Sequence, residues 1–400
     1  MVVSMVHIAG KNLAPQCERT LNGKSVKFIN SRLLPAPEAA DPIELSVNKK
    51  WGFKGAMLGG AGFVLDGDEY SRLAENSRNR DCLLPYLGGE ELNRSPTQDH
   101  QRYAICFGSQ PLEYAESYPD LLDIVRSRVK PERDKALDHG PGKHGKKYWW
   151  QYVIRADPLY KGIANLPRCI VTTITTAHLA FSFQRVDQVF PHSLVVFAFD
   201  RFSAFACLQS SIHNHWALMF SSYMGEGLRY SVSDAFHTFP FPESFLDDSV
   251  LEAIGREYYE HRARLMRESG EGLTKTYNKF HDPDNNTPEI QALRELHERL
   301  DARVLEAYGW PELVANCTYK FLSGDEGEDP DAGSREGKKV RWRYRWPNDF
   351  RDEVLGRLLE LNAKRASSLS GSGMAANGGS SLRTAPHKSL ESSGTEDLFS

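Results

Sequence analysis

The sequence predicts an α+β protein: a mixed α/β region, then a helical domain, then a disordered C-terminal tail. Between Trp51 and Pro242, short runs rich in β-branched and aromatic residues alternate with helix-like stretches. After Pro242, apolar residues recur every three or four positions, as they do on one face of a helix. Residues 366–400 are rich in Ser and Gly, a composition that buries too little apolar surface to fold.

The first residues predict a strand followed by a connector. Residues 1–13 open with a cluster of β-branched side chains, which indicates a strand. Because no partner strand precedes it, we interpret it as the last strand of a sheet whose remainder is missing from this chain. Residues 14–48 contain four prolines and predict a surface connector: Pro15, Pro35, Pro37 and Pro42.

Residues 49–242 are expected to form one domain of mixed strands and helices. Four segments have the composition of strands: 103–107, 169–176, 179–183 and 194–199. Two others, 112–133 and 203–220, are helix-like. Pro119 and Pro131 interrupt the first of these, so we expect two helices there.

The helical domain is expected over residues 243–323. Its clearest helix begins at Thr287-Pro288, an N-cap followed by proline, and ends at Gly309 and Pro311. A second helix is predicted over 248–267, and a C-terminal helix over 349–364, within a segment that spans 341–365. The acidic, Gly-rich residues 324–340 predict a mobile loop, and residues 366–400 a disordered tail.

Composition argues against membrane and disulfide-rich classes. The 400 residues carry a formal net charge of −4, with 40% hydrophobic and 26% charged residues, as in ordinary globular proteins. No apolar run approaches the ~18 residues that span a bilayer, and no basic leader opens the chain, so a cytoplasmic protein is expected. The cysteines show no C-x-x-C pair, which is typical of reduced thiols and not of structural zinc.

Three motifs invite a catalytic or nucleotide-binding reading, and the sequence favours none of them. The glycines at 55, 59, 60 and 62 lack the Gly-Lys-Ser/Thr of a phosphate-binding loop, so close backbone packing or contact with a sugar-phosphate chain is preferred. His213 and His215 lie in a segment with helical spacing, where their rings would diverge, so no metal site is predicted. Pro330-Asp331 and Glu336-Gly337-Lys338 mimic a nuclease signature but fall in the predicted mobile loop.

A basic, aromatic window is the strongest functional signal. Residues 126–168 hold eleven Lys and Arg against four Asp and Glu, a balance of +7 in a chain that is −4 overall. Trp149 and Trp150 lie within it. Cations release counterions from phosphate backbones and aromatic rings stack on bases, so nucleic acid is the expected partner. The alternative is that the tryptophans belong to the core and the lysines to a solvated loop.

Several longer stretches, taken together, resemble the target-recognition region of MmeI-like adenine-specific DNA methyltransferases. They include 51–55 (WGFKG), 60–65 (GAGFVL), 84–93 (LPYLGGEELN), 148–152 (YWWQY), 229–242 (RYSVSDAFHTFPFP), 273–281 (LTKTYNKFH) and the helix around 352–362. The resemblance covers roughly residues 1 to 365. Members of that family transfer a methyl group from S-adenosylmethionine to adenine N6 with an Asn/Asp-Pro-Pro-Tyr/Phe loop.

This chain departs from the family because it contains no Pro-Pro dipeptide. The resemblance therefore implies no catalytic residue and no cofactor in this chain, and S-adenosylmethionine in a catalytic domain that precedes Met1, of which residues 1–13 would be the last strand. The chain is then expected to be a fragment, a frameshift product or one half of a split enzyme. A non-catalytic protein-binding module and a methyltransferase with an unrecognised site remain the alternatives.

The implied role is DNA sequence recognition within a restriction-modification or phage-defence system. The expected partners are double-stranded DNA and a methyltransferase catalytic domain or subunit, which the helices after residue 242 would clamp to the recognition domain. We expect phosphate contacts from Lys54, Lys130, Lys146, Lys147 and Lys161, and base or phosphate contacts from Arg133 and Arg155. Of Trp149 and Trp150, one is expected to be buried and one exposed.

Overall fold

The computed structural model describes residues 20–21, 24–25, 41–224, 227–323 and 341–373. The strand predicted at 1–13, the loop predicted at 324–340 and the nuclease-like motif within it lie outside the described residues, as does most of the connector 14–48. A short pair, β1 (Thr20–Leu21) and β2 (Lys24–Ser25), is antiparallel. The first continuous segment leads into the 3-10 helix η1 (Ser46–Lys50).

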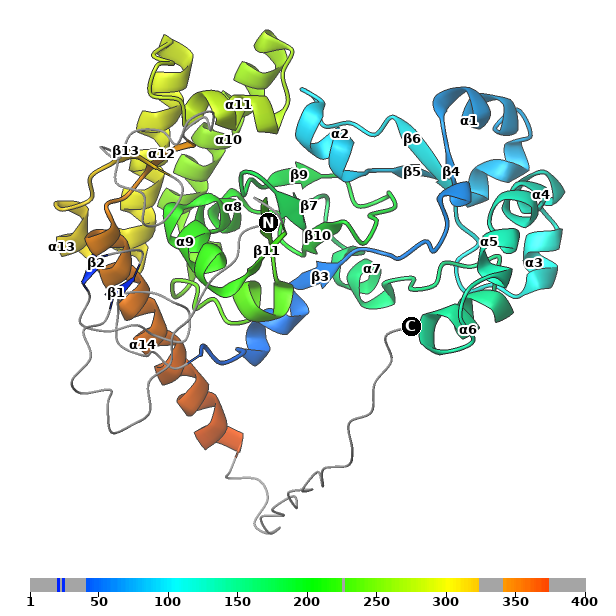
Figure 1. Cartoon of the computed structure of the whole chain (residues 1–400), viewed down its shortest axis with the longest axis horizontal. Helices are drawn as coiled ribbons and strands as arrows, with labels where there is room; N and C mark the ends of the chain where they lie inside the picture. Colours follow the sequence, from blue (N-terminus) through cyan, green and yellow to red (C-terminus); the bar gives the residue numbers. More distant parts are fainter. Residues whose placement is uncertain (1–19, 22–23, 26–40, 225–226, 324–340, 374–400) are drawn as a thin grey trace, which may run out of the picture.

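A four-stranded antiparallel sheet forms the centre of the molecule (Figure 1). Its order is β3 (Gly52–Lys54), β10 (Leu194–Phe197), β7 (Cys169–Thr173) and β9 (Ser182–Gln184). Successive side chains point to opposite faces. On one face, Val195 and Phe197 join the large core of helices α8 (Phe202–Gln209) and α9 (Ser211–Phe220). On the other, Val196 packs with helices α2 (Gly89–Arg94) and α7 (Asp157–Ile163).

A second, smaller sheet carries its own core on one side of the central sheet (Figure 1). Its antiparallel order is β4 (Val64–Leu65), β6 (Arg102–Ile105) and β5 (Leu83–Tyr86). Short helices surround it: η2 (Ala61–Phe63), α1 (Gly67–Leu73), η3 (Ser77–Cys82), α3 (Leu112–Glu116), α4 (Pro119–Arg128), α5 (Lys130–Asp134) and α6 (Gly140–Lys147).

The helix-like stretches predicted in this region break into more pieces than expected. The stretch 112–133 forms three helices instead of two, because α4 begins at Pro119 and α5 places Pro131 near its own start, where a missing N–H is tolerated. The stretch 203–220 forms two, because Ser210 has an extended backbone and its side chain caps α9 at the His213 amide. The four predicted strands are all present, and 169–176 divides into β7 and β8 (Thr175–Thr176).

The residues after 220 form a third small sheet and then the helical region. The third sheet has the order β11 (Ser222–Met224), β12 (Gly227–Arg229), β8. Next come the π-helix η4 (Val232–Phe236), η5 (Phe245–Asp247), α10 (Ser249–Ser269), α11 (Leu273–Phe280), α12 (Pro288–Ala307), α13 (Pro311–Val314), β13 (Lys320–Ser323), β14 (Trp342–Arg345) and α14 (Asn348–Gly373).

The three long helices occur where the periodicity predicted them. Thr287 is the N-cap residue of α12 although its side chain makes no capping bond, and Gly309 has a positive φ of 77° just past the end. The predicted boundary at 365 is wrong, because α14 continues to Gly373 and takes up the first residues assigned to the tail. Once Val354 and Leu358 bury one face, each added residue extends the helix at the cost of ordering only itself. No helix in the described part of the chain is long and apolar enough to cross a membrane.

Arg133 is a buried hub of the smaller core. Its guanidinium donates to five main-chain carbonyls: Leu58 (2.6 Å), Gly59 (3.2 Å), Gly145 (3.3 Å), Tyr148 (3.0 Å) and Gln151 (2.7 Å). Burial lowers the pKa of Arg133 to about 10, so the side chain is still a cation at neutral pH. One side chain thus holds the glycine-rich loop, α6 and the turn after α6 together.

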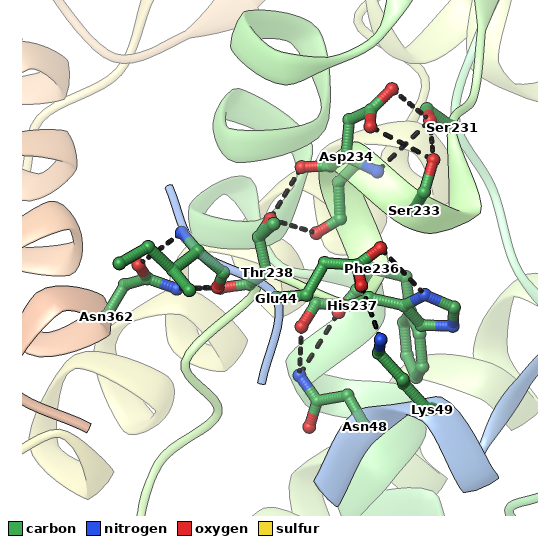
Figure 2. Close-up of polar contacts among 12 residues, drawn as sticks. Glu44, Asn48, Lys49, Ser231, Ser233, Asp234, Phe236, His237, Thr238 and Asn362 are labelled. Atoms are coloured by element: carbon green, nitrogen blue, oxygen red, sulfur yellow. Dashed lines mark hydrogen bonds and ion pairs between the residues drawn. The ribbon is translucent and has the colours of Figure 1, made fainter. Parts of the chain in front are cut away.

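A second polar network joins the start of the continuous chain to its last helix (Figure 2). The Asn48 amide donates to the carbonyls of Phe236 (3.2 Å), His237 (3.3 Å) and Phe239 (2.8 Å). Asn362 of α14 donates to the carbonyls of Ile43 (2.8 Å) and Thr238 (2.7 Å) and accepts from the Ile43 amide (2.9 Å). Phe239, Pro240, Phe241 and Pro242 are all buried, so this stretch packs against the core.

Arg133→Met should lower the free energy of unfolding by about 3 kcal/mol or more, because a buried carbonyl left without a donor costs about 1–3 kcal/mol. Urea unfolding followed by tryptophan fluorescence measures this change. Lys135→Ala, an exposed neighbour, is the matched control and should change the free energy by less than about 0.5 kcal/mol. An Arg133→Met protein as stable as the Lys135→Ala protein would contradict the structural role.

Asn362→Ala should lower the free energy of unfolding by about 2 kcal/mol, because it removes three hydrogen bonds that anchor α14. The matched control is Lys364→Ala, which changes an exposed residue of the same helix. Limited proteolysis offers a second measurement: cleavage within α14 should become faster in the Asn362→Ala protein alone. Equal cleavage rates in the two variants would count against the anchor.

Candidate nucleic-acid interface

The structure distributes the basic window over α4, α5, α6, α7 and the turns between them. Several of its cations pair with nearby carboxylates. Lys130 contacts Asp134 (2.8 Å), Lys146 contacts Asp138 (2.9 Å) and Arg155 contacts Asp157 (3.0 Å). The Arg155 guanidinium holds the pKa of the Asp157 carboxyl below its usual value. Exposed pairs of this kind are worth about 0–1 kcal/mol, so a phosphate can replace the carboxylate at little cost.

The two tryptophans are both buried, so the expectation that one is exposed is wrong. Trp149 and Trp150 are 9% and 8% exposed and belong to the core of the smaller sheet. The Trp150 indole donates to the Gln110 carbonyl (3.0 Å), so its only polar atom is satisfied inside the protein. Arg133 is also buried, at 4% exposure, which corrects its expected contact with bases or phosphates. Its donors are directed at carbonyls of its own chain.

Four of the exposed lysines form no close ion pair with a described carboxylate. In the described part of the chain, no carboxylate lies within ion-pair distance of Lys54, Lys143, Lys147 or Lys161. Lys143 and Lys147 are four residues apart on α6 and therefore lie on one side of that helix. The Lys147 ammonium also lies 5.0 Å from the centre of the Tyr148 ring. Lys161 projects from α7 beside the central sheet.

The strand register brings a second group of polar residues to one end of the central sheet. Val195 is opposite Lys54, and Leu194 is opposite Thr173, so β3 and β7 end where β10 begins. The Ile174 amide donates to the Ser193 carbonyl (2.8 Å), and Thr175 of β8 is opposite Arg229 of β12. We name this the sheet-end surface, and its exposed members are Lys54, Thr175, His192, Ser193 and Arg229.

The sheet-end surface continues toward Arg155 along the glycine-rich segment. The His192 amide donates to the Ala56 carbonyl (2.7 Å), and Met57 and Ile154 exchange main-chain hydrogen bonds of 2.8 and 3.1 Å. Arg155 follows Ile154 directly. The backbones approach so closely that a Cβ on Gly55 would lie 2.1 Å from the Pro191 carbonyl oxygen. This confirms close backbone packing at Gly55; contact with a sugar-phosphate chain stays a prediction.

Arg229 and Thr175 are members that sequence reasoning did not single out as DNA-binding. Both lie outside the basic window, so a count of charge along the chain cannot find them. The sequence offers only the apolar-polar alternation of Leu228 and Arg229, and the structure shows that Leu228 is buried and Arg229 exposed, as in a half-covered strand. In this antiparallel register Met224, Arg229 and Thr175 point to the same outward face of the small sheet, and Met224 is 54% exposed.

The histidine motif is part of the core. His213 and His215 lie on the helix α9, as the spacing predicted, and both are buried. The His213 Nε2 atom is 2.9 Å from the Tyr230 hydroxyl, and burial lowers the pKa of His213 to about 3. Among the described residues, no group of three or more His, Cys, Asp or Glu side chains is arranged to hold a metal ion.

A serine, histidine and aspartate also meet beside α9, in a geometry that does not fit nucleophilic catalysis. His297 Nε2 is 3.0 Å from the Ser211 hydroxyl and 3.7 Å from Asp301 Oδ2, so one ring nitrogen faces both groups. A catalytic histidine uses its two nitrogens separately. Asp301 instead accepts from the Ser211 amide (2.8 Å) at the start of α9. The three residues therefore fasten α12 to α9.

Comparison with known proteins finds a matching family and a solved structure of similar fold. The family described as "MmeI, target recognition domain" matches residues 45–243. A solved structure titled "Structure of Type IIL restriction-modification enzyme MmeI in complex with DNA has implications for engineering of new specificities" is similar in fold, with a TM-score of 0.58 and 16% sequence identity. The alignment covers 86% of this chain and 39% of that one. No curated protein matches the sequence.

The family match spans all three of these sheets, the basic window and every member of the sheet-end surface, while α10 to α14 lie beyond it. The structural similarity extends over the larger part of the chain, although the chain spans only about two fifths of the solved relative's length. On this evidence, residues 45–243 belong to the MmeI target recognition domain family.

Proposed function

We propose that this chain is the DNA sequence-recognition part of a site-specific adenine-N6 DNA methyltransferase, in the cytoplasm, within a restriction-modification or phage-defence system. The observation that carries the proposal is the sheet-end surface, an exposed polar and basic edge built inside a recognition domain of the MmeI family. The solved structure of similar fold is, by its title, a complex with DNA.

The chemistry explains why recognition and methyl transfer are separate tasks. Adenine N6 is out of reach inside a stacked duplex, so the base must be flipped out, which costs a few kcal/mol. A recognition domain decides which adenine is presented. Phosphate contacts set the position of the protein on the duplex, whereas side chains that reach base edges set the sequence.

The exposed cations divide naturally between these two tasks. Lys147 and Lys161 project from helices, form no close ion pair within the described part of the chain and suit phosphates. Lys54 lies at the end of β3, where the backbone passes close to its neighbours. Arg229 has a planar guanidinium on an outward strand face and is our candidate for a bidentate contact with guanine. Lys130, Lys146 and Arg155 contribute after exchanging a carboxylate for a phosphate.

The catalytic step belongs, in this proposal, to a partner domain or subunit. The 400 residues contain no Pro-Pro dipeptide, so the Asn/Asp-Pro-Pro-Tyr/Phe loop is absent from this chain. S-adenosylmethionine would bind in the partner. The helical region would hold the partner in place, and exposed Ile43 and Val47, 55% and 46% accessible, offer apolar area for such a contact.

That apolar area also favours a second candidate, a protein-binding module without DNA. The two functions differ in their response to salt, because phosphate contacts release counterions and apolar contacts do not. A third possibility, a methyltransferase with an unrecognised site, requires that labelled S-adenosylmethionine bind to the chain alone.

The double substitution Lys147→Ala with Lys161→Ala should weaken binding to every duplex by a similar factor. A plot of log affinity against log salt should become less steep by about 2, because each lost phosphate contact removes about 0.9 from the slope. Fluorescence anisotropy with labelled duplexes gives both quantities when it is measured between about 50 and 200 mM salt. Over this range, affinity that depends on phosphate contacts falls by roughly 10³-fold or more.

The control is Lys275→Ala with Lys364→Ala, which removes two exposed lysines outside residues 45–243. This protein should bind as the wild type does. If the wild type fails to bind any duplex at low salt, or binds a protein partner with no dependence on salt, the DNA proposal is wrong.

Arg229→Ala should reduce sequence choice more than affinity for DNA in general. Selection of a random duplex pool by the wild-type protein supplies a preferred duplex, and scrambling it supplies the comparison. Binding to the preferred duplex should weaken about tenfold or more, as expected for a lost bidentate contact of about 1–3 kcal/mol, with little change on the scrambled duplex. Arg201→Ala, an exposed arginine beyond the opposite end of β10, is the matched control. Equal losses on both duplexes would assign Arg229 to phosphate.

A further inference from the structure

We propose that Asn278 of α11, acting through His178, is a positioning residue for DNA recognition that lies outside the MmeI recognition domain. It holds the strand β8 in place, and through β8 it also holds β12, the strand that carries Arg229. The inference rests on the proposed function, since it assigns a support to the sheet-end surface.

Strand β8 needs such a support because it is short and has one neighbour. It consists of Thr175 and Thr176 and lies at the edge of its sheet, paired with β12 alone. The pairing sets Thr175 opposite Arg229, and the Tyr230 amide donates to the Ile174 carbonyl (2.7 Å). A two-residue edge strand contributes little stability by itself. Its position therefore depends on what holds the residues that follow it.

Those residues form a tight turn that ends at His178. The Thr176 hydroxyl donates to the His178 carbonyl (2.7 Å) and accepts from the His178 amide (3.3 Å). Any displacement of His178 is therefore passed to β8 over two residues. The Arg343 guanidinium of β14 also donates to the Ala177 carbonyl (3.2 Å), so the turn is held from the helical region at two points.

The His178 ring is fixed against α11. Its Nε2 atom is 2.7 Å from Asn278 Oδ1, and because a carbonyl oxygen can only accept, Nε2 carries the proton. The ring stacks on His281, with centroids 5.1 Å apart and planes 23° apart, and the His281 Nδ1 atom accepts from the Tyr344 amide (3.1 Å). Burial, with the nearby Arg343 guanidinium, lowers the pKa of His178 to about 4, so the ring is neutral at neutral pH.

Asn278 can be changed without disturbing the core, unlike its neighbours in the same region. Arg262 of α10 also reaches the recognition domain, where it donates to the Phe181 carbonyl, but it is 1% exposed and enclosed by aromatic rings. Its loss would leave buried acceptors in the core without a donor and destabilise the whole fold. The Asn278 side chain is exposed, and its one described hydrogen bond is that with His178. A substitution at Asn278 can therefore test the positioning role without disrupting the fold.

The test compares Asn278→Ala, Asn278→Asp and the control Lys275→Ala, an exposed residue one turn earlier on α11. The full chain is used, with the preferred and scrambled duplexes described above. Asn278→Ala should weaken binding to the preferred duplex about fivefold, the value of one hydrogen bond, and leave the scrambled duplex unchanged, while the melting temperature falls by no more than about 2–4 °C. Asn278→Asp retains an acceptor oxygen and should bind as the wild type does.

A DNA-free measurement accompanies the binding assay. Amide hydrogen exchange in peptides that cover residues 174–178 and 228–230 should be about fivefold faster in Asn278→Ala than in the other two proteins. Unchanged exchange, or an equal loss on both duplexes, overturns the inference. If the wild type selects no duplex from the pool, the proposed function fails instead, whereas a selective wild type with an equally selective Asn278→Ala protein rejects only the positioning role.

Discussion

The register of β10 between β3 and β7 is the constraint on which the candidate interface depends. It ends two strands where a third begins and so gathers residues from Lys54 to Arg229, which are 175 positions apart, on one edge. A shift of one residue in an antiparallel pair sends every side chain to the opposite face. Val195 and Phe197 would then leave the large core, so burial of the sheet also fixes the position of the polar edge.

Cations in this protein serve two different purposes, and burial separates them. Arg133 and Arg262 hold main-chain carbonyls inside the protein, each joining segments that are distant in sequence. Lys143 and Lys147 of α6 and Lys161 of α7 keep their charge in solvent. A guanidinium can take the first role because it presents five N–H donors in a rigid plane. An ammonium, which is a compact and strongly hydrated charge, is better suited to contact with phosphate.

Features that depend on nearby residues could be predicted from the sequence, whereas features that depend on distant residues could not. Periodicity and capping residues act within a few positions, so α10 and α12 could be predicted. The break at Ser210 depends on a local capping residue as well, but it was missed. The family resemblance located the recognition domain, because it combines motifs that have no clear meaning when each is taken alone. Charge counting found α6 but also counted Arg133, because composition does not report burial. Thr175 and Arg229 become neighbours only through strand pairing, which no window of sequence contains.

The bonds between Ile43 and Asn362 join positions that are 319 residues apart. The segment that enters the continuous fold, near Ile43, therefore lies against the last helix, α14, near Asn362. Fraying at one of these segments therefore loosens the other, because α14 and the chain before η1 anchor each other.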